Sequence, residues 1–206
     1  MQIWLIRHGT TAANRERRFQ GRLDYPLSPQ GRREARLLAE RVKGLAPDLL
    51  LSSDLQRAWE TAQIIAQATG LVVRPLPLLR ECSWGVAEGK PLEEIYTIYP
   101  SLRAAEAAQI SAEFFGGESK KRLLARAGLV LRLLSRRFAH RRRVVLVSHG
   151  RFINALLACS LGLSADQFWP FAPAPASLSM ISCEEERREY RLELFNDRCH
   201  LRSGEK

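Results

Sequence analysis

Three short apolar runs, each ending abruptly in polar side chains, constrain the fold of this chain more than any other feature. The runs span residues 2–6, 49–51 and 144–147. The polar residues that follow them are Arg7-His8, Ser52-Ser53 and Ser148-His149. Continuous apolar runs are typical of strands buried on both faces of a parallel sheet. Because the carboxyl ends of parallel strands open on one edge of the sheet, we expect these polar residues to lie together where such sheets bind ligands.

Helical patterns separate these runs. Ser28 followed by Pro29 predicts a helix that ends near Gly44, and Asp54 is expected to cap a second helix that ends at Gly70. A long amphipathic pattern covers residues 119–138, and further strands are expected at 71–73, 178–182 and 190–194, the last two joined by a turn at 184–189. The alternation predicts an α/β fold, a three-layer sandwich with a mostly parallel central sheet and helices on both faces.

The length of 206 residues suits one compact domain, so we expect a single domain over residues 1–206. Residues 80 to about 117 interrupt the alternation with prolines, paired glycines and a short helical pattern at 92–99. This stretch resembles a small lid inserted into the core. The apolar N-terminal run is too short for a signal sequence or a membrane span, so a cytoplasmic protein without a membrane partner is expected.

The charge balance favours an anionic partner. The chain has 32 Lys and Arg against 22 Asp and Glu, a formal net charge of +10. Basic runs at 15–18, 136–137 and 141–143 lack the interleaved aromatic residues of a nucleic-acid groove, so we interpret them as solvated faces and expect no nucleic-acid partner. The four cysteines form no C-x-x-C pair, which argues against a zinc or redox motif.

Two of the four histidines share a context that points to chemistry. His8 and His149 each follow an apolar strand and precede a glycine, which lets the backbone approach a ligand, whereas His140 and His200 have neither feature and are expected at the surface. Arg7 follows the first strand, and its guanidinium fork matches phosphoryl oxygens. A phosphoryl group is therefore the expected occupant of this sheet edge.

The residues around these positions resemble a known family. Residues 7–14, R-H-G-T-T-A-A-N, resemble the R-H-G-x-T-x-x-N signature of the histidine phosphatase superfamily, also called the phosphoglycerate-mutase-like fold. Residues 52–62 resemble its S-S-x-L-x-R-A-x-x-T-A block, and residues 81–89 its E-x-x-x-G-x-x-E-G block. G-G-E-S at 116–119 and V-S-H-G at 147–150 complete the series in the family's order.

The resemblance implies roles for individual residues. His8 is the implied nucleophile, which becomes phosphorylated, and Glu81 is the implied proton donor to the leaving oxygen, with Trp84 as a desolvating neighbour. The residues implied to hold the phosphoryl oxygens are Arg7, Arg57 and His149. The implied substrate-binding residues are Asn14, Gln20, Gly21 and Gly150. No metal or other cofactor is implied, and the chain offers no carboxylate cluster of the kind that binds Mg²⁺.

Residues 81–85 favour a hydrolase over a mutase. They are E-C-S-W-G, where mutases resemble one another around E-R-H-Y-G, and the lid is short. We therefore expect a metal-independent phosphomonoester hydrolase acting on a small phosphorylated metabolite, and the chain looks most like α-ribazole phosphatases and broad-specificity phosphatases. A phosphoglycerate mutase and a non-catalytic anion or nucleic-acid binder are the alternatives.

The sequence allows two interpretations of the residues on the leaving-group side of the site. Trp84, Phe114, Phe115 and Trp169 would either wall this side with apolar surface or form core under the lid. Arg22 and Arg151 would either read a second anionic group or lie on the surface. Thr10 stands where many family members have Glu, which puts in doubt a second carboxyl group near His8. Exposed apolar residues on the C-terminal strands would support a homodimer.

Overall fold

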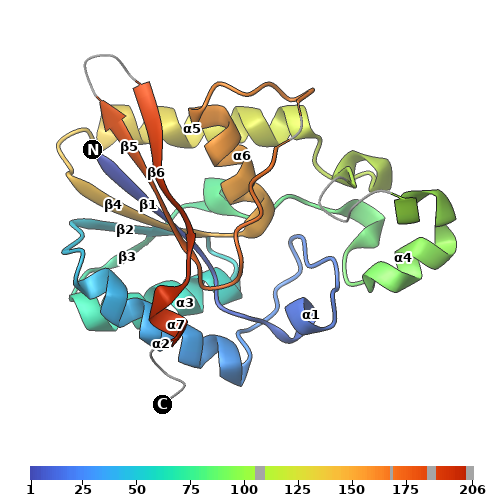
Figure 1. Cartoon of the computed structure of the whole chain (residues 1–206), viewed down its shortest axis with the longest axis horizontal. Helices are drawn as coiled ribbons and strands as arrows, with labels where there is room; N and C mark the ends of the chain where they lie inside the picture. Colours follow the sequence, from blue (N-terminus) through green and yellow to red (C-terminus); the bar gives the residue numbers. More distant parts are fainter. Residues whose placement is uncertain (105–109, 168, 185–188, 203–206) are drawn as a thin grey trace.

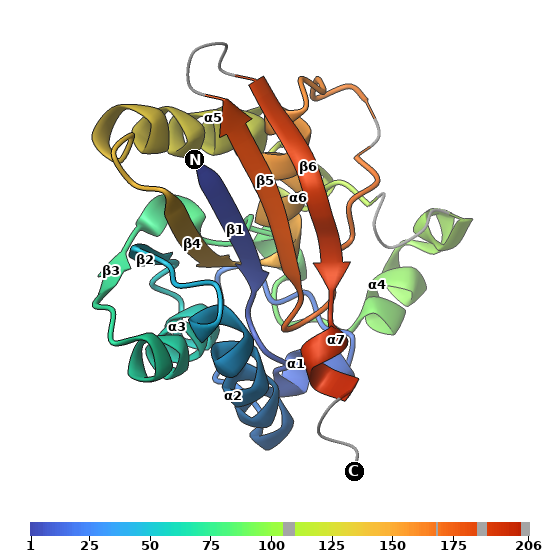
Figure 2. The same ribbon diagram turned by 60° about the vertical axis from the view of Figure 1, so that its left-hand side comes forward.

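The computed structural model describes residues 1–104, 110–167, 169–184 and 189–202, which form one six-stranded sheet between helices (Figures 1 and 2). Its strands are β1 (Gln2–Arg7), β2 (Leu49–Ser52), β3 (Val73–Pro75), β4 (Arg143–Ser148), β5 (Leu178–Glu184) and β6 (Glu189–Asp197). The strand order is β3-β2-β4-β1-β5-β6. The expected α/β sandwich with a mostly parallel sheet is confirmed.

The helices are α1 (Ala12–Arg15), α2 (Pro29–Lys43), α3 (Gln56–Thr69), α4 (Leu92–Ile98), α5 (Lys120–Arg137), α6 (Gly150–Ser160) and α7 (Cys199–Arg202). Two helices, α5 and α6, cover one face of the sheet, and α2 and α3 cover the other (Figure 2). Successive side chains of β1 enter the two cores in turn, since Ile3 and Leu5 pack under α5 and α6 while Trp4 and Ile6 pack against α2 and α3. Burial on both faces explains the continuous apolar runs.

The strand register brings the three polar strand ends to one edge. β1 and β2 both pair in parallel with β4, with Arg7 opposite Ser148 and Ser52 opposite Val147. Strand β5 runs antiparallel to β1, and β6 runs antiparallel to β5, so these two strands extend the sheet on that side. The prediction that the ends of residues 2–6, 49–51 and 144–147 share an edge is therefore confirmed.

Several predicted helix ends are confirmed, and one is wrong. The hydroxyl of Ser28 accepts the N–H of Gly31 at the start of α2, and Gly70 ends α3 with φ of 73°. Asp54 does not cap α3. Its carboxylate binds the guanidinium of Arg80 instead, with Oδ1 2.7 Å from Nε.

The start of α3 is capped by a residue far away in sequence. The carboxylate of Asp24 accepts the N–H of Gln56, the first residue of the helix, at 2.6 Å. The expected strand at 71–73 is also displaced, because β3 begins only at Val73. No helix in the described ranges is both long and apolar enough to cross a membrane.

The 80–117 segment lies to one side of the sheet and contains α4 within the short helix expected at 92–99 (Figure 1). Its remaining described structure consists of 3₁₀ turns and irregular chain, anchored to residues 16–19 by an N–H donated from Leu92 to Arg17 and one from Phe19 to Lys90. Residues 105–109 of this segment and 185–188 of the expected turn lie outside the described residues.

The chain that follows β1 lies in close contact with the start of α2, where both sides of the contact contain a glycine. A Cβ placed on Gly31 would lie 2.0 Å from the carbonyl oxygen of Thr10, and one placed on Gly9 would lie 2.5 Å from the carbonyl oxygen of Gly31. Both contacts are with backbone, which cannot turn aside as a flexible side chain does. This close approach fixes the position of the residues directly after His8.

Gly31→Ala is expected to destabilise the protein by about 3 kcal/mol, because the added methyl group overpacks a backbone contact. Gly128→Ala in α5 is the matched control, since its Cβ would meet only flexible side-chain atoms at 3.4 Å or more. Higher helix propensity should make that variant more stable by up to about 1 kcal/mol. Urea denaturation of both variants measures the difference, and equal stability of the two would show that the approach is not tight.

Candidate active site

His8 follows β1 and is 2% exposed. Its Nδ1 lies 2.7 Å from the carbonyl oxygen of Gly9. A carbonyl can only accept, so Nδ1 carries the proton and Nε2 keeps its lone pair. Burial, together with the charges of Arg57 and Arg7, lowers the pKa of His8 well below 6.5. The imidazole is therefore neutral at neutral pH and has the tautomer that a nucleophile at Nε2 requires.

Two buried guanidinium groups flank His8, and backbone carbonyls hold both. Arg57 of α3 donates from Nη1 to Leu23 O and from Nη2 to Gly21 O, each at 2.8 Å. Burial lowers the pKa of Arg57 to about 10, which leaves it charged at neutral pH. Arg7 donates from Nη1 to Pro173 O at 2.7 Å, and burial lowers its pKa as well.

His149, the residue before α6, lies beside His8 with the two ring centroids 5.1 Å apart. Its Nε2 is 2.8 Å from the hydroxyl of Ser53, which also accepts the N–H of Leu55. Ser53 therefore orients His149 from the end of β2. Burial, with the charge of Arg57 second, lowers the pKa of His149 well below 6.5, so this ring too is neutral.

Three buried nitrogens of these residues have no hydrogen-bond partner within the described part of the chain. They are Nε of Arg7, Nε of Arg57 and Nδ1 of His149. A buried polar group without a partner costs about 1 to 3 kcal/mol, so native proteins rarely keep several in one place. Two guanidinium groups with free N–H donors beside a neutral imidazole form a site suited to the oxygens of a phosphoryl group.

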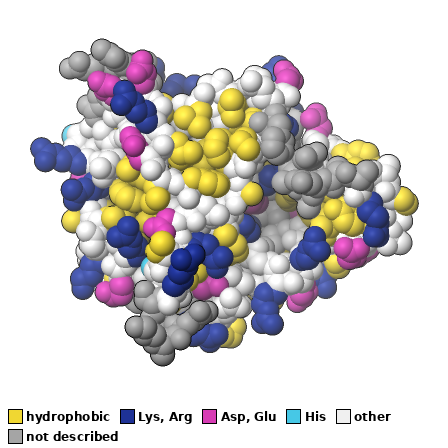
Figure 3. All heavy atoms as spheres, viewed as in Figure 1, with side chains coloured by type: hydrophobic (Ala, Val, Ile, Leu, Met, Phe, Trp, Pro, Cys, Tyr) yellow, Lys and Arg dark blue, Asp and Glu magenta, His cyan; other side chains and the backbone are white. Residues whose placement is uncertain are grey.

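The cavity that contains His8 has a volume of about 160 Å³. Seven of the residues predicted from the sequence line it: Arg7, His8, Asn14, Gln20, Gly21, Arg57 and Glu81. Arg18, Phe19 and Trp84 complete its wall. Figure 3 shows the surface hollowed between the body of the molecule and the side on which α4 lies.

Gly150, the other predicted substrate-binding residue, lies against Arg7 rather than in the lining of this cavity. A Cβ on Gly150 would lie 3.3 Å from Cζ of Arg7. Gly150 therefore leaves room for the guanidinium group of Arg7, and it affects the site by allowing that position of Arg7.

Glu81 is held at the first turn of α6. Its Oε1 accepts the N–H groups of Cys82 at 2.9 Å and Phe152 at 3.1 Å, and its Oε2 accepts that of Arg151 at 3.2 Å. Backbone N–H groups at a helix start have no partner within the helix, and a carboxylate there also complements the helix dipole. The same contacts fix the Glu81 carboxyl group at the wall of the cavity.

Arg126 of α5 holds the chain that carries Glu81, a role that the sequence analysis missed. It donates five hydrogen bonds, the full capacity of a guanidinium group. Two go to the carboxylate of Glu118, and the others go to the carbonyl oxygens of Leu78, Arg80 and Glu81. The only sequence signal was Glu118 within the G-G-E-S block, since Arg126 resembles the other cations on the polar side of α5.

A carboxylate does lie close to the His8 motif, although Thr10 replaces the common Glu. Glu34 of α2 accepts the N–H of Thr10 at 2.9 Å and its hydroxyl at 3.0 Å. Glu34 is only 7% exposed, and Gln30 donates to the same carboxylate. This contact ties Thr10 to α2.

The aromatic residues expected near the leaving group divide between core and cavity. Of these four residues, Trp84 lines the described cavity around His8 and is also part of the buried core, to which Phe115 and Trp169 belong without lining that cavity. Phe114 is 55% exposed and packs edge-on against Tyr99.

The remaining candidates lie as follows. Arg151 stacks over Trp84, with Cζ 4.7 Å from the ring centroid, and donates to Ile110 O, while Arg22 is exposed and lies 3.6 Å from Glu118. His140 is exposed as predicted. His200 is only partly at the surface, because it is half-buried and its Nε2 lies 3.0 Å from Ala176 O.

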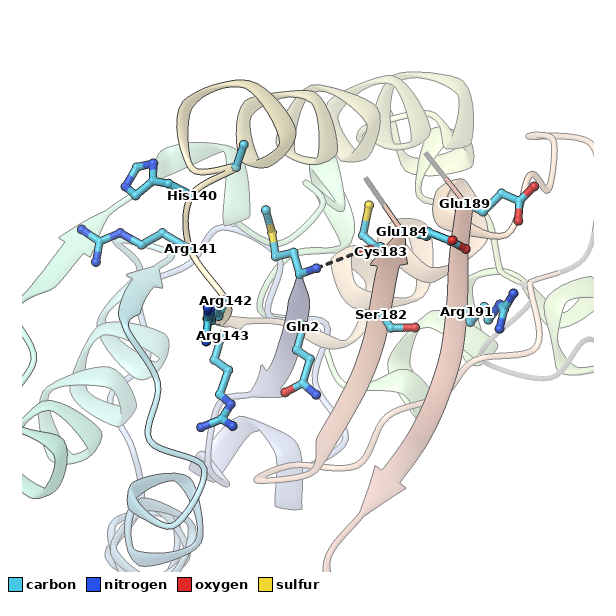
Figure 4. Close-up of a pocket in the computed structure, with 12 residues that line it drawn as sticks. Gln2, His140, Arg141, Arg142, Arg143, Ser182, Cys183, Glu184, Glu189 and Arg191 are labelled. Atoms are coloured by element: carbon cyan, nitrogen blue, oxygen red, sulfur yellow. Dashed lines mark hydrogen bonds between the residues drawn. The ribbon is translucent and has the colours of Figure 1, made fainter. Parts of the chain in front are cut away.

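A larger cavity, about 640 Å³, lies at the opposite edge of the sheet (Figure 4). It opens between the chain before β4 and the ends of β5 and β6, and both Arg141–Arg143 and the carboxylates of Glu184 and Glu189 line it. None of the motif residues reaches it. Size alone therefore does not mark the active site.

The two neutral histidines make stability depend on pH. Since both pKa values are lowered from 6.5, the unfolded chain binds protons below that pH that the folded protein does not bind. We expect the free energy of unfolding to have its full value above pH 6.5. Below that pH it should fall by about 1.4 kcal/mol per pH unit for each histidine. Urea titrations between pH 7 and 5 measure this slope.

The exposed His140 provides the control for this slope. His140→Gln should keep the slope of the parent protein, whereas His8→Asn should reduce it. A parent protein whose stability does not change over this range would contradict the neutral state of both buried rings.

Known proteins match this chain over most of its length. The family model of the histidine phosphatase superfamily (branch 1) matches residues 3–198. A probable phosphoglycerate mutase, GpmB, of Yersinia pestis is 34% identical over 195 residues, which cover 92% of this chain and 85% of the relative.

Two solved structures show the same fold. A mycobacterial glucosyl-3-phosphoglycerate phosphatase in complex with VO₃ is 37% identical, with a TM-score of 0.83 and coverage of 95% of this chain and 98% of that one. A putative alpha-ribazole-5'-P phosphatase from Escherichia coli is 28% identical, with a TM-score of 0.82 and coverage of 96% and 97%. With its motifs assembled at one sheet edge and the family model matched over nearly the whole chain, this protein belongs to the histidine phosphatase superfamily.

Proposed function

We propose that this protein hydrolyses phosphomonoesters in two steps through a phosphohistidine on His8, without a metal ion. In the first step Nε2 of His8 attacks phosphorus, the bond from phosphorus to the ester oxygen breaks, and Glu81 gives a proton to the leaving oxygen. In the second step water attacks the phosphorus of the phosphohistidine, Glu81 takes a proton from the water, and the N–P bond breaks. Inorganic phosphate leaves, and both residues return to their starting states.

The cations around His8 suit the charge that develops during this transfer. The transferred group carries negative charge on its equatorial oxygens, so fixed donors stabilise the transition state with little rearrangement. Arg7, Arg57 and His149 supply these donors. Asn14 adds another, because its Oδ1 accepts the N–H of Thr11 at 3.0 Å and its Nδ2 makes no hydrogen bond within the described residues.

The observation that carries the proposal is the pairing of a fixed His8 tautomer with unpaired donors around it. The Nδ1 contact to Gly9 O leaves Nε2 as the reactive atom, and Nε of Arg7, Nε of Arg57 and Nδ1 of His149 are buried without partners within the described residues. Both features suit a phosphoryl group bound between the nucleophile and the cations.

The residues after Glu81 favour hydrolysis over a mutase reaction. The resemblance of mutases around E-R-H-Y-G implies polar side chains there for a sugar acid, but here Cys82 is buried and the hydroxyl of Ser83 binds Glu88 at 3.1 Å. Since curated relatives are named as probable phosphoglycerate mutases, a mutase is the second candidate. Since an alpha-ribazole phosphatase from Shigella flexneri and the putative one from Escherichia coli have similar structures, α-ribazole 5'-phosphate is one candidate substrate.

The test is release of inorganic phosphate from 4-nitrophenyl phosphate in excess chelator, followed by a comparison of kcat/KM across phosphomonoesters. The set includes α-ribazole 5'-phosphate, 3-phosphoglycerate and nucleoside monophosphates. Turnover in chelator supports the proposal, and a strict need for Mg²⁺ contradicts it. Interconversion of phosphoglycerates that exceeds hydrolysis and needs a bisphosphorylated primer would identify the mutase.

A further inference from the structure

A second cavity, about 430 Å³ in volume, adjoins the one that contains His8. The two share four lining residues, Arg7, Asn14, Arg18 and Phe19, so they lie next to each other along these side chains. We call the cavity at His8 the inner chamber and its neighbour the outer chamber. The inner chamber is smaller than the roughly 300 to 1,000 Å³ of typical small-molecule pockets. A leaving group of more than a few atoms would therefore extend into the outer chamber.

The outer chamber has a cationic wall. Arg17 and Arg18 both line it, and no Asp or Glu occurs among its described lining residues. Arg17 is exposed and has no ion pair or side-chain hydrogen bond within the described residues. Arg18 is held in place, since it pairs with Glu16 and donates from Nη1 to Gly89 O at 2.9 Å. One guanidinium group is thus free for a ligand, and the other is positioned between the two chambers.

The backbone of Arg17 has a φ of 52°, a left-handed conformation that residues other than glycine, asparagine and aspartate seldom adopt. Contacts on both sides hold it there, because its N–H donates to Asn14 O at 3.2 Å and its carbonyl accepts the N–H of Leu92 at 3.0 Å. Asn14 lines both chambers, and Leu92 lines the outer one. Residues in such strained backbone conformations are often found where a protein binds a ligand.

We propose that Arg17 and Arg18 bind a second negatively charged group, carried by the alcohol part of the substrate. The preferred substrates would then be phosphomonoesters whose leaving group bears a carboxylate or a second phosphate. This inference depends on the proposed function only in that the scissile phosphoryl group lies at His8. A guanidinium fork matches either anion in geometry, and no carboxylate occurs among the described lining residues. Glu16 offsets part of the charge of Arg18, so Arg17 supplies most of the attraction.

The experiment compares 4-carboxyphenyl phosphate with 4-(hydroxymethyl)phenyl phosphate, two esters of similar size that differ in the charge of the leaving group. We expect the parent protein to favour the carboxylated ester by about tenfold in kcat/KM, and the preference to weaken as salt screens the charges. Arg17→Gln should reduce the ratio to about twofold or less. Arg15→Gln removes the same charge from the same exposed segment but lies outside both chambers, so it should keep the parent ratio.

A third ester, benzene-1,4-diyl bisphosphate, distinguishes the two anions. A larger preference for it than for the carboxylated ester identifies phosphate as the second group, and the reverse identifies carboxylate. An equal rate on the charged and neutral esters, or an equal effect of Arg17→Gln and Arg15→Gln, would overturn the inference and leave the proposed hydrolysis intact. A preference for α-ribazole 5'-phosphate over the carboxylated ester would also overturn it, since that leaving group carries no negative charge.

Binding measurements keep the inference testable even without turnover. Isothermal titration of His8→Ala with the carboxylated and neutral esters should show the same preference of about tenfold. If that preference is present but the parent protein hydrolyses neither ester, the proposed function is wrong and the binding of a second anion by Arg17 and Arg18 is still supported. If the two esters bind His8→Ala equally, Arg17 and Arg18 do not bind the charged group.

Discussion

His8→Ala is expected to lower kcat for every phosphomonoester by about 10⁴-fold, because removal of a nucleophile eliminates the covalent route and leaves only the binding of the substrate by the surrounding cations. His140→Ala is the matched control, since it removes an exposed imidazole that lies outside the site. Steady-state assays of the three proteins measure the effect. Far-ultraviolet circular dichroism shows whether the loss of a buried ring has changed the fold.

A trapping experiment tests the same residue without relying on rates. Brief incubation with a ³²P-labelled ester and quenching in base should leave label on the parent protein and none on His8→Ala, because a phosphoramidate survives base and is lost in acid. Label located on another residue by peptide mapping, or full turnover by His8→Ala, would remove the basis of the proposed mechanism.

Glu81→Gln is expected to lower kcat by about 10²- to 10³-fold for alkyl phosphates, whose leaving oxygens need a proton. The amide keeps an oxygen that can accept from the first turn of α6, so the local fold should persist. For 4-nitrophenyl phosphate the loss should be about tenfold or less in the phosphorylation step, because the phenolate leaves without protonation. Rapid-quench measurement of that step across a series of leaving groups gives the comparison.

Glu60→Gln is the control for this variant, since Glu60 pairs with Arg32 and does not line the cavity that contains His8. An equal loss for alkyl and nitrophenyl esters would show that Glu81 supports the site without transferring a proton. A variant with parent activity on alkyl esters would assign the proton to another group.

The elements that local sequence could predict are those with local causes. A buried parallel strand must be apolar along its whole length, and Ser28-Pro29 and Gly70 act through their own backbone geometry. The contacts that sequence missed join distant segments. Asp54 and Asp24 are equally good candidates to cap α3 by composition, and only the path of the chain decides that Asp24 does so.

The site divides in the same way. The position of His8 follows from the strand it ends, and its tautomer depends on the next residue in the chain. Arg126 could not be singled out among the many arginines of the chain, because its partners come from two separate segments that meet it only in the folded protein. The fate of Phe115, which lies in the core rather than at the substrate, likewise depends on how the 80–117 segment packs.

The hydrogen bonds between the Glu81 carboxyl group and the first amides of α6 make these amides sensitive to the protonation of Glu81. Whenever this carboxyl group gains or loses a proton, the acceptors available to the amides of Arg151 and Phe152 change. The nitrogen and proton chemical shifts of these two amides should therefore follow the charge of the acid through the catalytic cycle. Nuclear magnetic resonance could then observe the free and phosphorylated forms without any probe attached to the substrate.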